Sequence, residues 1–151
     1  MIGTAHHYGV TVSDIDESIE FYRDVLGLEL TDRRTIESGS EDSRKFSKFV
    51  GVPGDLEITI AFLDAGGADV ELLEYQPAGA DANEGVANND PGAAHFCLEV
   101  DDVDGAYERI EADVEAVHEP VTLSKGTRVM YLYDPDGNVV ELADRSGVDD
   151  D

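Results

Sequence analysis

The chain has 151 residues, of which 41% are hydrophobic, with 35 acidic side chains against 10 Lys and Arg and a net charge of −25. This hydrophobic content excludes an intrinsically disordered composition and is sufficient for one domain with a real core, or for two small fused halves. The negative charge makes nucleic acid and anionic membrane surfaces poor partners.

The acidic residues are spread along the whole chain, so their mutual repulsion acts against any compact state in dilute salt. At about 1 M ionic strength the Debye length is about 3 Å, and the repulsion is then screened. We therefore expect a halophilic protein, with an ordinary acidic cytosolic protein as the alternative. No apolar run approaches the length of a membrane span and no signal peptide is visible, so the expected location is the cytoplasm.

The first half alternates between strand-like and helix-like patterns. Asp14 can cap a helix whose apolar residues recur at helical spacing, and Gly27 can end it. Residues 33–55 are polar and contain glycine, which predicts a long, mobile connection. In chain order the predicted elements are a strand at 5–12, a helix at 15–27, a strand starting at 28–31, and a hairpin of 56–64 and 68–75.

Residues 76–92 are rich in Gly, Ala, Asn and Pro and predict a linker, after which the order of elements repeats. The predicted elements are a strand at 94–100, a helix at 104–114, a short strand within 114–123, a strand at 127–133, a turn at 134–137 and a strand at 138–144. We therefore expect a single α+β domain of two tandem βαβββ modules that form a curved mixed sheet around an open cleft. Its parts are module one at 5–75, the linker at 76–92, module two at 93–144 and a flexible acidic tail at 145–151.

Two stretches share one template that begins with histidine. HYGVTVSDID (7–16) and HFCLEVDDVD (95–104) both read His, aromatic, any residue, aliphatic, any residue, Val, any residue, Asp, aliphatic, Asp. The last strands, VELLEY and VELAD, are also equivalent, since Glu71 follows Asp64 by seven positions and Glu141 follows Asp134 by seven. Such a repeat indicates a duplicated unit.

Strand alternation places the duplicated side chains on the face away from each helix. A carboxylate in an apolar strand is unfavourable without a partner, and this chain has few cations. Two imidazoles and two carboxylates form a suitable site for Ni²⁺, Zn²⁺, Mn²⁺, Co²⁺ or Fe²⁺. We therefore predict metal binding by His7, Glu71, His95 and Glu141, with Glu141 or Glu71 also acting as the catalytic base.

The remaining candidates have simpler interpretations. Alternation puts His6 on the other face, as an alternative ligand to His7, and His118 is interpreted as a surface residue. Cys97, the only cysteine, excludes an intrachain disulfide and is expected in the core or a cleft wall. Glu74 and Glu99 are interpreted as outward or rim charges.

HYGVTVSDIDESIEFYRDVLGLEL, VELLEY, AAHFCLEVDDVDGAYERI and YLYDPDGNVVEL together resemble the vicinal oxygen chelate superfamily, from His7 to about Asp144. This superfamily includes glyoxalase I, methylmalonyl-CoA epimerase, extradiol dioxygenases, fosfomycin-resistance enzymes and metal-free bleomycin-binding proteins. The resemblance implies paired βαβββ modules around an open metal cleft, and a homodimer that often shares the site between subunits.

The ligand order is closest to glyoxalase I, which carries His, Glu, His and Glu on strands one, four, five and eight. Glutathione-dependent members tend to have a basic residue just before the Val-Leu-Gly that ends the first helix, where this chain has Asp24. The thiol or the substrate is therefore expected to differ. Arg44, Lys45 and Lys48 gather a large share of the scarce cations, which predicts an anionic ligand there.

The resemblance implies a metal-dependent, lactoylglutathione lyase-like enzyme that acts on a small 2-oxo or hemithioacetal compound through an enediolate. The alternatives are another superfamily enzyme, such as an epimerase or an extradiol dioxygenase, and a non-catalytic binding or resistance protein. Metal analysis separates the last from the others. The sequence leaves open the metal, the thiol, the substrate, and whether the site lies in one chain or across a dimer.

Overall fold

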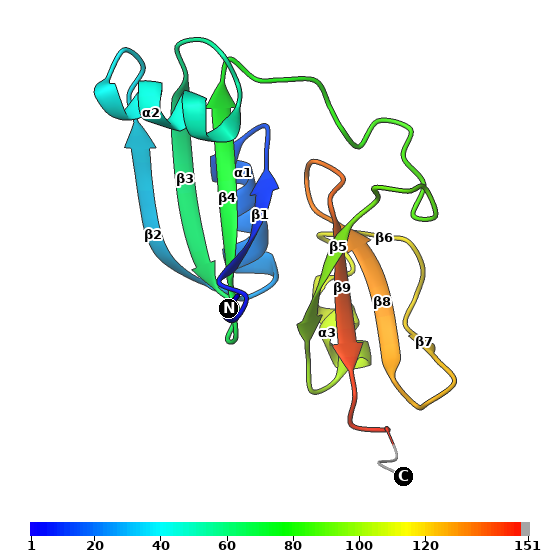
Figure 1. The fold of residues 1–151 in the computed structure, drawn as a ribbon. Helices are drawn as coiled ribbons and strands as arrows, with labels where there is room; N and C mark the ends of the chain where they lie inside the picture. The colour runs from blue at the N-terminus through cyan, green and yellow to red at the C-terminus, as the bar shows by residue number, and fades with distance from the viewer. Residues whose placement is uncertain (149–151) are drawn as a thin grey trace. The chain divides into compact units, whose positions relative to one another are not determined.

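The computed structural model describes residues 1–148, and the chain forms two compact units, one ending at Asp81 and the other beginning at Ala82. Figure 1 shows a sheet and helical segments in each unit. Residues 149–151 of the acidic tail predicted at 145–151 lie outside the described residues. Within the described part, no helix has the length and apolar character needed to cross a membrane.

The first unit is built on a four-stranded sheet in the order β1-β4-β3-β2. Strand β1 runs parallel to β4, and the other two pairings are antiparallel, so that β3 and β4 form a hairpin at the centre (Figure 1). The strands are β1 (His7–Thr11), β2 (Glu29–Ile36), β3 (Glu57–Asp64) and β4 (Asp69–Gln76).

The second unit repeats this arrangement with the order β5-β9-β8-β6 and with β7 paired to β8. Strand β5 is parallel to β9, as β1 is to β4, and helix α3 (Val103–Ile110) follows β5. The strands are β5 (His95–Glu99), β6 (Glu115–Ala116), β7 (Val121–Thr122), β8 (Arg128–Tyr133) and β9 (Val139–Asp144). The predicted α+β class is therefore confirmed, and each unit has a mixed sheet of its own.

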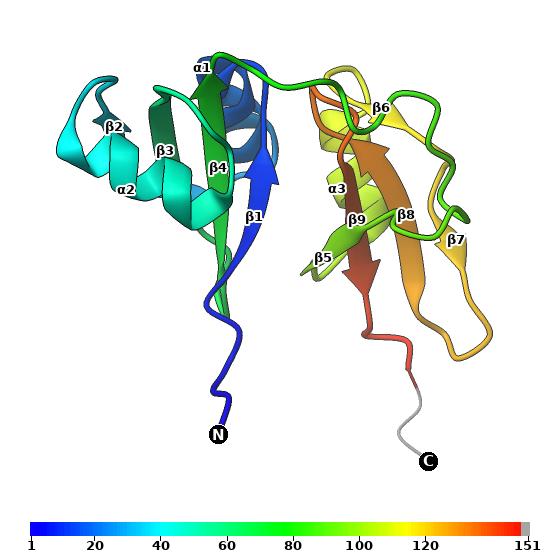
Figure 2. The ribbon, with the colours of Figure 1, turned by 45° about the horizontal axis from the view of Figure 1, so that its top comes forward.

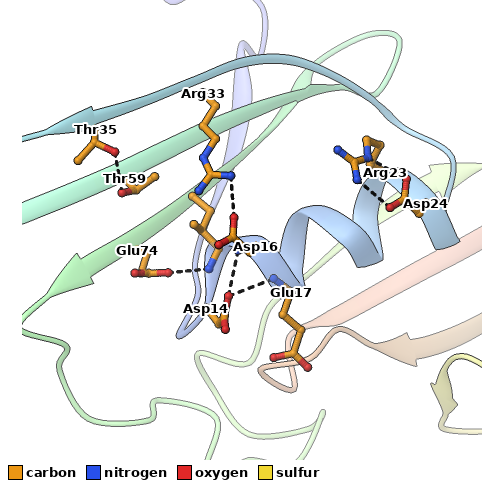
Figure 3. A network of polar contacts seen from close by, with 10 residues as sticks. Asp14, Asp16, Glu17, Arg23, Asp24, Arg33, Thr35, Thr59 and Glu74 are labelled. Carbon is orange, nitrogen blue, oxygen red and sulfur yellow. Dashed lines mark hydrogen bonds and ion pairs between the residues drawn. The ribbon is translucent and has the colours of Figure 1, made fainter.

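The helical segment after β1 is not a uniform α-helix. Helix α1 (Ile15–Ile19) continues as a π-helical segment, η1 (Glu20–Val25), and Gly27 ends it with a φ of 85°. Asp14 caps it as predicted, because its carboxylate accepts hydrogen bonds from two first-turn N–H groups at 3.0 and 3.1 Å (Figure 3).

Two further contacts, drawn in Figure 3, join this helix to the strands of its unit. The carboxylate of Glu74 accepts the Ile15 N–H at 2.6 Å, and Arg33 forms an ion pair of 2.6 Å with Asp16. Glu74 is therefore not the outward charge that its sequence position indicates. It lies on the helix-facing side of β4 and satisfies a backbone donor that the helix leaves open.

The alternation predicted for β1 is confirmed. Val10 and Val12 are each 4% exposed, whereas His7 and Thr11 are exposed on the opposite side. Buried residues of α1, η1, β3 and β4 complete the core of the first unit, namely Ile15, Ile19, Phe21, Tyr22, Ala61, Leu63, Val70 and Leu72. Apolar burial of this kind is the main favourable term in folding.

The predicted mobile connection at 33–55 is wrong. Residues up to Ile36 extend β2, and α2 (Glu41–Val50) fills most of the rest, capped by Ser40 and ended by Gly51 in the left-handed conformation. Phe46 and Val50 pack against a cluster of β3 and the residue before it: Leu56, Ile58 and Ile60. Figure 2 shows α2 lying across its sheet.

This cluster shows which face α2 covers. Ile58 is paired with Tyr75, so both belong to the face opposite Glu74 and α1. The Phe46 and Tyr75 rings lie 6.4 Å apart, and the buried Ser43 hydroxyl donates to the Leu56 carbonyl at 2.5 Å. Helix α2 therefore covers one end of the face that carries His7 and Glu71.

In the second unit, Asp134 organises the turn between β8 and β9, as predicted for a turn former. Its buried carboxylate accepts hydrogen bonds from the backbone of Asp136 and from the backbone and side chain of Asn138. Asn83, within the predicted linker, donates to the Asp136 carbonyl and the Asn138 side chain. The part of the linker in this unit is thus joined to the turn.

Candidate metal centre

The first unit brings His7 and Glu71 together. Glu71 lies directly opposite Gly9 in the parallel ladder, so that His7 is two residues away on the same face. His7 Nε2 lies 2.9 Å from Glu71 Oε2, with 40% of the histidine side chain and 13% of the glutamate side chain exposed. The Phe62 ring, on the neighbouring strand opposite Glu71, lies 5.8 Å from the imidazole.

The second unit brings His95 and Glu141 together in the same way. Glu141 lies opposite Cys97 in the parallel pair of β5 and β9, and His95 Nε2 lies 3.1 Å from Glu141 Oε2. These side chains are 42% and 20% exposed. The Tyr131 hydroxyl, which comes from β8 opposite Glu141, lies 3.2 Å from His95 Nε2.

The two pairs occupy equivalent positions in their sheets, but their neighbours differ. Gly9 in one unit corresponds to Cys97 in the other, and Phe62 corresponds to Tyr131. Each sheet therefore repeats the histidine and the glutamate, whereas the thiol of Cys97 and the phenol of Tyr131 have no counterpart at Gly9 and Phe62.

The registers also correct one equivalence from the sequence. Asp64 is paired with Asp69 at the end of β3, whereas Tyr133 is the last residue of β8 and pairs with Val139. Asp64 thus corresponds to Tyr133 and not to Asp134, because the second turn is longer by one residue. For this reason, counting the same number of residues back from Glu71 and from Glu141 does not identify Tyr131 as the counterpart of Phe62.

The donor atoms of each pair fit a divalent cation. Two ligand atoms that bind one ion at about 2.1 Å and at right angles to each other lie about 3.0 Å apart. The separations of 2.9 and 3.1 Å between histidine Nε2 and glutamate Oε2 match this spacing. Among residues 1–148, no three or more His, Cys, Asp or Glu side chains group around one point that could hold a metal ion.

The electrostatic surroundings of both pairs are negative. Burial, followed by the charges of Glu141 and Glu99, raises the pKa of Cys97 to about 11. Burial and Glu141 likewise raise the pKa of Tyr131, and burial and Glu71 raise the pKa of Tyr75. Carboxylates that keep neighbouring acids protonated also favour a bound cation at the same place.

The other predicted positions are distributed differently. His118 is an exposed residue whose Nδ1 lies 2.7 Å from its neighbour's carbonyl oxygen, as expected for a surface residue. His6 does not turn away from His7 as alternation predicts, since the two Nδ1 atoms lie 2.7 Å apart. Alternation does not apply to His6 because β1 begins only at His7. Cys97 is exposed at its strand position although neighbouring atoms cover part of its thiol, and it lies on the same face as His95, so it is not a core residue.

Several of the scarce cations already have local partners. Arg23 makes two hydrogen bonds of 2.8 Å to Asp24, and this contact raises the pKa of the guanidinium. Lys45 forms an ion pair with Glu41, and Arg44 donates to the Gly39 carbonyl. The anionic ligand that Arg44, Lys45 and Lys48 predict therefore stays a prediction.

Comparison with known proteins agrees with this arrangement. A family model for the Glyoxalase/Bleomycin resistance protein/Dioxygenase superfamily matches residues 4–142. The chain is 31% identical to a 2-epi-5-epi-valiolone epimerase from Actinomyces sp. over 91% of its own length and 76% of that protein's. It is 29% identical to a lactoylglutathione lyase from Pseudomonas putida, over 91% and 82% of the two chains.

The fold has a solved counterpart as well. A glyoxalase family protein from Bacillus cereus superposes with a TM-score of 0.81, at 22% identity, over 95% of both chains. The family match over most of the chain, together with the repeated β-sheet units, identifies the protein: it belongs to the Glyoxalase/Bleomycin resistance protein/Dioxygenase superfamily, also called the vicinal oxygen chelate superfamily.

Proposed function

We propose that the protein is a metal-dependent, glyoxalase I-like lyase that isomerises a small 2-oxo or hemithioacetal compound. The observation that carries the proposal is the pair of His–Glu contacts at equivalent positions of the two sheets, at 2.9 and 3.1 Å. The 29% identical lactoylglutathione lyase supports this choice of reaction.

In this proposal His7, Glu71, His95 and Glu141 hold one divalent ion, from one chain or from two copies of it. When bound, the ion would polarise two substrate oxygens that sit on neighbouring carbons. The hydrogen on one of these carbons would thereby become more acidic. The imidazoles serve as neutral ligands through Nε2, the atom that faces the carboxylate in each pair. The resemblance also implies a homodimer, which light scattering in concentrated salt would test.

The glutamates are the groups that can move the proton. In a hemithioacetal, Glu71 or Glu141 removes the proton from the carbon that carries sulfur and hydroxyl, which leaves an enediolate. The same carboxylic acid then delivers the proton to the former ketone carbon. The hydroxyl of the first carbon loses its proton and becomes the carbonyl, and the former ketone oxygen gains a proton and becomes the hydroxyl. The net result is a 2-hydroxy thioester, with no oxidant or reductant consumed.

Glutathione is not the expected thiol. Where glutathione-dependent members carry a basic residue, this chain carries Asp24, and the neighbouring Arg23 guanidinium is bound to it, so neither offers a cation to the carboxylates of glutathione. We therefore expect a thiol with less negative charge, or a substrate that is not a thiol adduct.

An epimerase is the second candidate, favoured by the 31% identical valiolone epimerase. It would use the same ligands and the same carboxylate chemistry, but the proton would return to the carbon from which it came. An extradiol dioxygenase, another type of enzyme in the superfamily, would instead require iron and oxygen uptake on a catechol.

The experiment starts from protein prepared in concentrated KCl, analysed for bound metal, stripped, and reloaded separately with Ni²⁺, Zn²⁺, Mn²⁺, Co²⁺ and Fe²⁺. Each form is assayed with methylglyoxal and a panel of thiols, including glutathione and uncharged thiols. We expect metal-dependent turnover that falls at least about 100-fold in Glu71→Gln or Glu141→Gln, whichever is the base, and that is unchanged in Glu29→Gln, an exposed strand glutamate.

The outcomes separate the candidates. Deuterium incorporation at a chiral carbon without isomerisation would favour the epimerase, and oxygen uptake by the iron form on a catechol would favour the dioxygenase. Tight binding of a small molecule without turnover in any metal form would contradict an enzymatic function and favour a binding protein.

A further inference from the structure

The imidazole of His6 lies where a strand residue would not place it. Residue 6 precedes β1, and its carbonyl accepts the Asp69 N–H at 2.9 Å, which fixes the backbone at the entrance to the strand. The ring then meets His7 edge to face, with centroids 5.0 Å apart, and also meets Phe62 at 6.5 Å. His6 is therefore held by one backbone bond and two ring contacts beside His7.

The contact between the two histidines joins like atoms. Nδ1 of His6 and Nδ1 of His7 are 2.7 Å apart, so one of them carries the hydrogen and the other accepts it. The opposite nitrogen of His7, Nε2, faces the Glu71 carboxylate at 2.9 Å. Without a cation, Nε2 carries hydrogen and donates to Glu71, and the bare Nδ1 of His7 accepts from His6.

A cation ligated by His7 requires the reverse arrangement. A ligating Nε2 must be bare, so the hydrogen of a neutral His7 moves to Nδ1, which then needs an acceptor. His6 can become that acceptor by carrying its own hydrogen on Nε2 instead of Nδ1. The exchange moves one hydrogen from one nitrogen to the other within each ring.

We propose that His6 is a positioning residue that fixes the ring and the tautomer of His7 through the Nδ1–Nδ1 hydrogen bond. The proposal rests on the proposed function, because it assumes that His7 is a metal ligand. It concerns one half of the centre only. The residue before His95 is Ala94, and the ring of His95 instead meets the Tyr131 hydroxyl, 3.2 Å from Nε2 and 3.4 Å from Nδ1.

The test compares the full-length wild type with His6→Phe, which keeps an aromatic ring against Phe62, and with His6→Asn, whose amide can both donate and accept. His118→Phe, a change at an exposed histidine, is the matched control for lost surface imidazole. Zn²⁺ affinity is measured by competition with a chelator. Nitrogen-15 NMR of the imidazoles reports the tautomer of His7 with and without Zn²⁺.

We expect His6→Phe to weaken Zn²⁺ binding about 10- to 100-fold. We expect His6→Asn to restore part of the loss and His118→Phe to cause none. In the wild type the His7 hydrogen should move from Nε2 to Nδ1 on Zn²⁺ binding, and His6→Phe should shift the Nδ1 resonance of zinc-bound His7, because the Nδ1–H has then lost its acceptor. Circular dichroism verifies that each variant is folded.

Wild-type Zn²⁺ affinity and an unchanged Nδ1 resonance of zinc-bound His7 in His6→Phe would overturn the role of His6 and leave the proposed function intact. Direct coordination of Zn²⁺ by a nitrogen of His6 would also overturn it, because His6 would then be a ligand. If the wild type bound none of the divalent ions, the proposed function would fail and the role of His6 with it.

Discussion

Replacement of Glu74 tests how helix α1 is held against the sheet that carries His7 and Glu71. In Glu74→Ala the Ile15 N–H loses a partly buried carboxylate acceptor at 2.6 Å. A hydrogen bond to a charged group contributes about 1.5–3 kcal/mol. A negative charge near a helix N-terminus adds about 0.3–1 kcal/mol, screened by salt. Because Asp14 still caps the helix and water can reach its first turn, we expect a loss of about 1.5–2 kcal/mol.

The assay is urea unfolding at one fixed, high KCl concentration, followed by circular dichroism because the chain has no tryptophan. Urea is preferred to guanidinium, since guanidinium would itself screen the charge of −25. Glu29→Ala, at an exposed position of β2, controls for the relief of repulsion that follows the loss of any carboxylate. Glu74→Gln keeps an uncharged acceptor and should lose about half as much as Glu74→Ala. A Glu74→Ala variant no less stable than Glu29→Ala would refute the reasoning.

Three further predictions concern other parts of the chain. Cys97, with a pKa of about 11, should react with iodoacetamide at pH 9 about 50-fold more slowly than in the urea-unfolded chain, and equal rates would contradict the raised pKa. Ser43→Ala should cost about 1–3 kcal/mol by leaving the Leu56 carbonyl without its donor, as measured by urea unfolding against Ser38→Ala, and a loss equal to that of this exposed control would contradict it. Arg128 holds the pKa of Asp104 below its usual 3.8, so this contact stabilises the fold above that pH and the stabilisation is lost as the pH falls through the lowered value. Asp104→Asn should therefore lower the melting temperature at pH 7 but not near pH 2, and the same loss at both would exclude the ion pair as its cause.

The strand pattern of this sequence is informative because a period of two assigns each side chain to a face. Val10 and Val12 identify the buried side of β1, and His7 follows on the other side by alternation alone. The same reasoning places His95 and Glu141 together. Pairing of parallel strands then brings each histidine to its glutamate, which explains why the contacts within both pairs could be anticipated from the repeat.

The sequence does not predict helix α2, because seven of its ten residues are polar. Its signals were nevertheless present: Ser40 for the cap, Phe46 and Val50 four residues apart, and Gly51 for the end. Three apolar residues, Phe46, Phe49 and Val50, in a polar stretch are weak evidence for a helix without knowledge of the sheet that it covers. Here tertiary packing against Ile58 makes the segment regular.

The neighbours of the two pairs depend on features that a single sequence does not encode locally. The position of Tyr131 beside His95 depends on the register of a hairpin whose turn is one residue longer than its counterpart. The position of His6 depends on where β1 begins, since a strand one residue longer would turn this ring to the other face. Both are set by cross-strand hydrogen bonds.

The central claim is that the two His–Glu pairs bind one cation together. The most direct measurement is the Zn²⁺ stoichiometry and affinity of the wild type and of His7→Ala and His95→Ala, by calorimetry in concentrated KCl. We predict that the wild type binds one high-affinity ion per chain, so that two His–Glu pairs share each ion. Either variant should lose that site. If each variant kept an ion at the pair that it leaves intact, with undiminished affinity, the two pairs would be separate sites and the account would be contradicted.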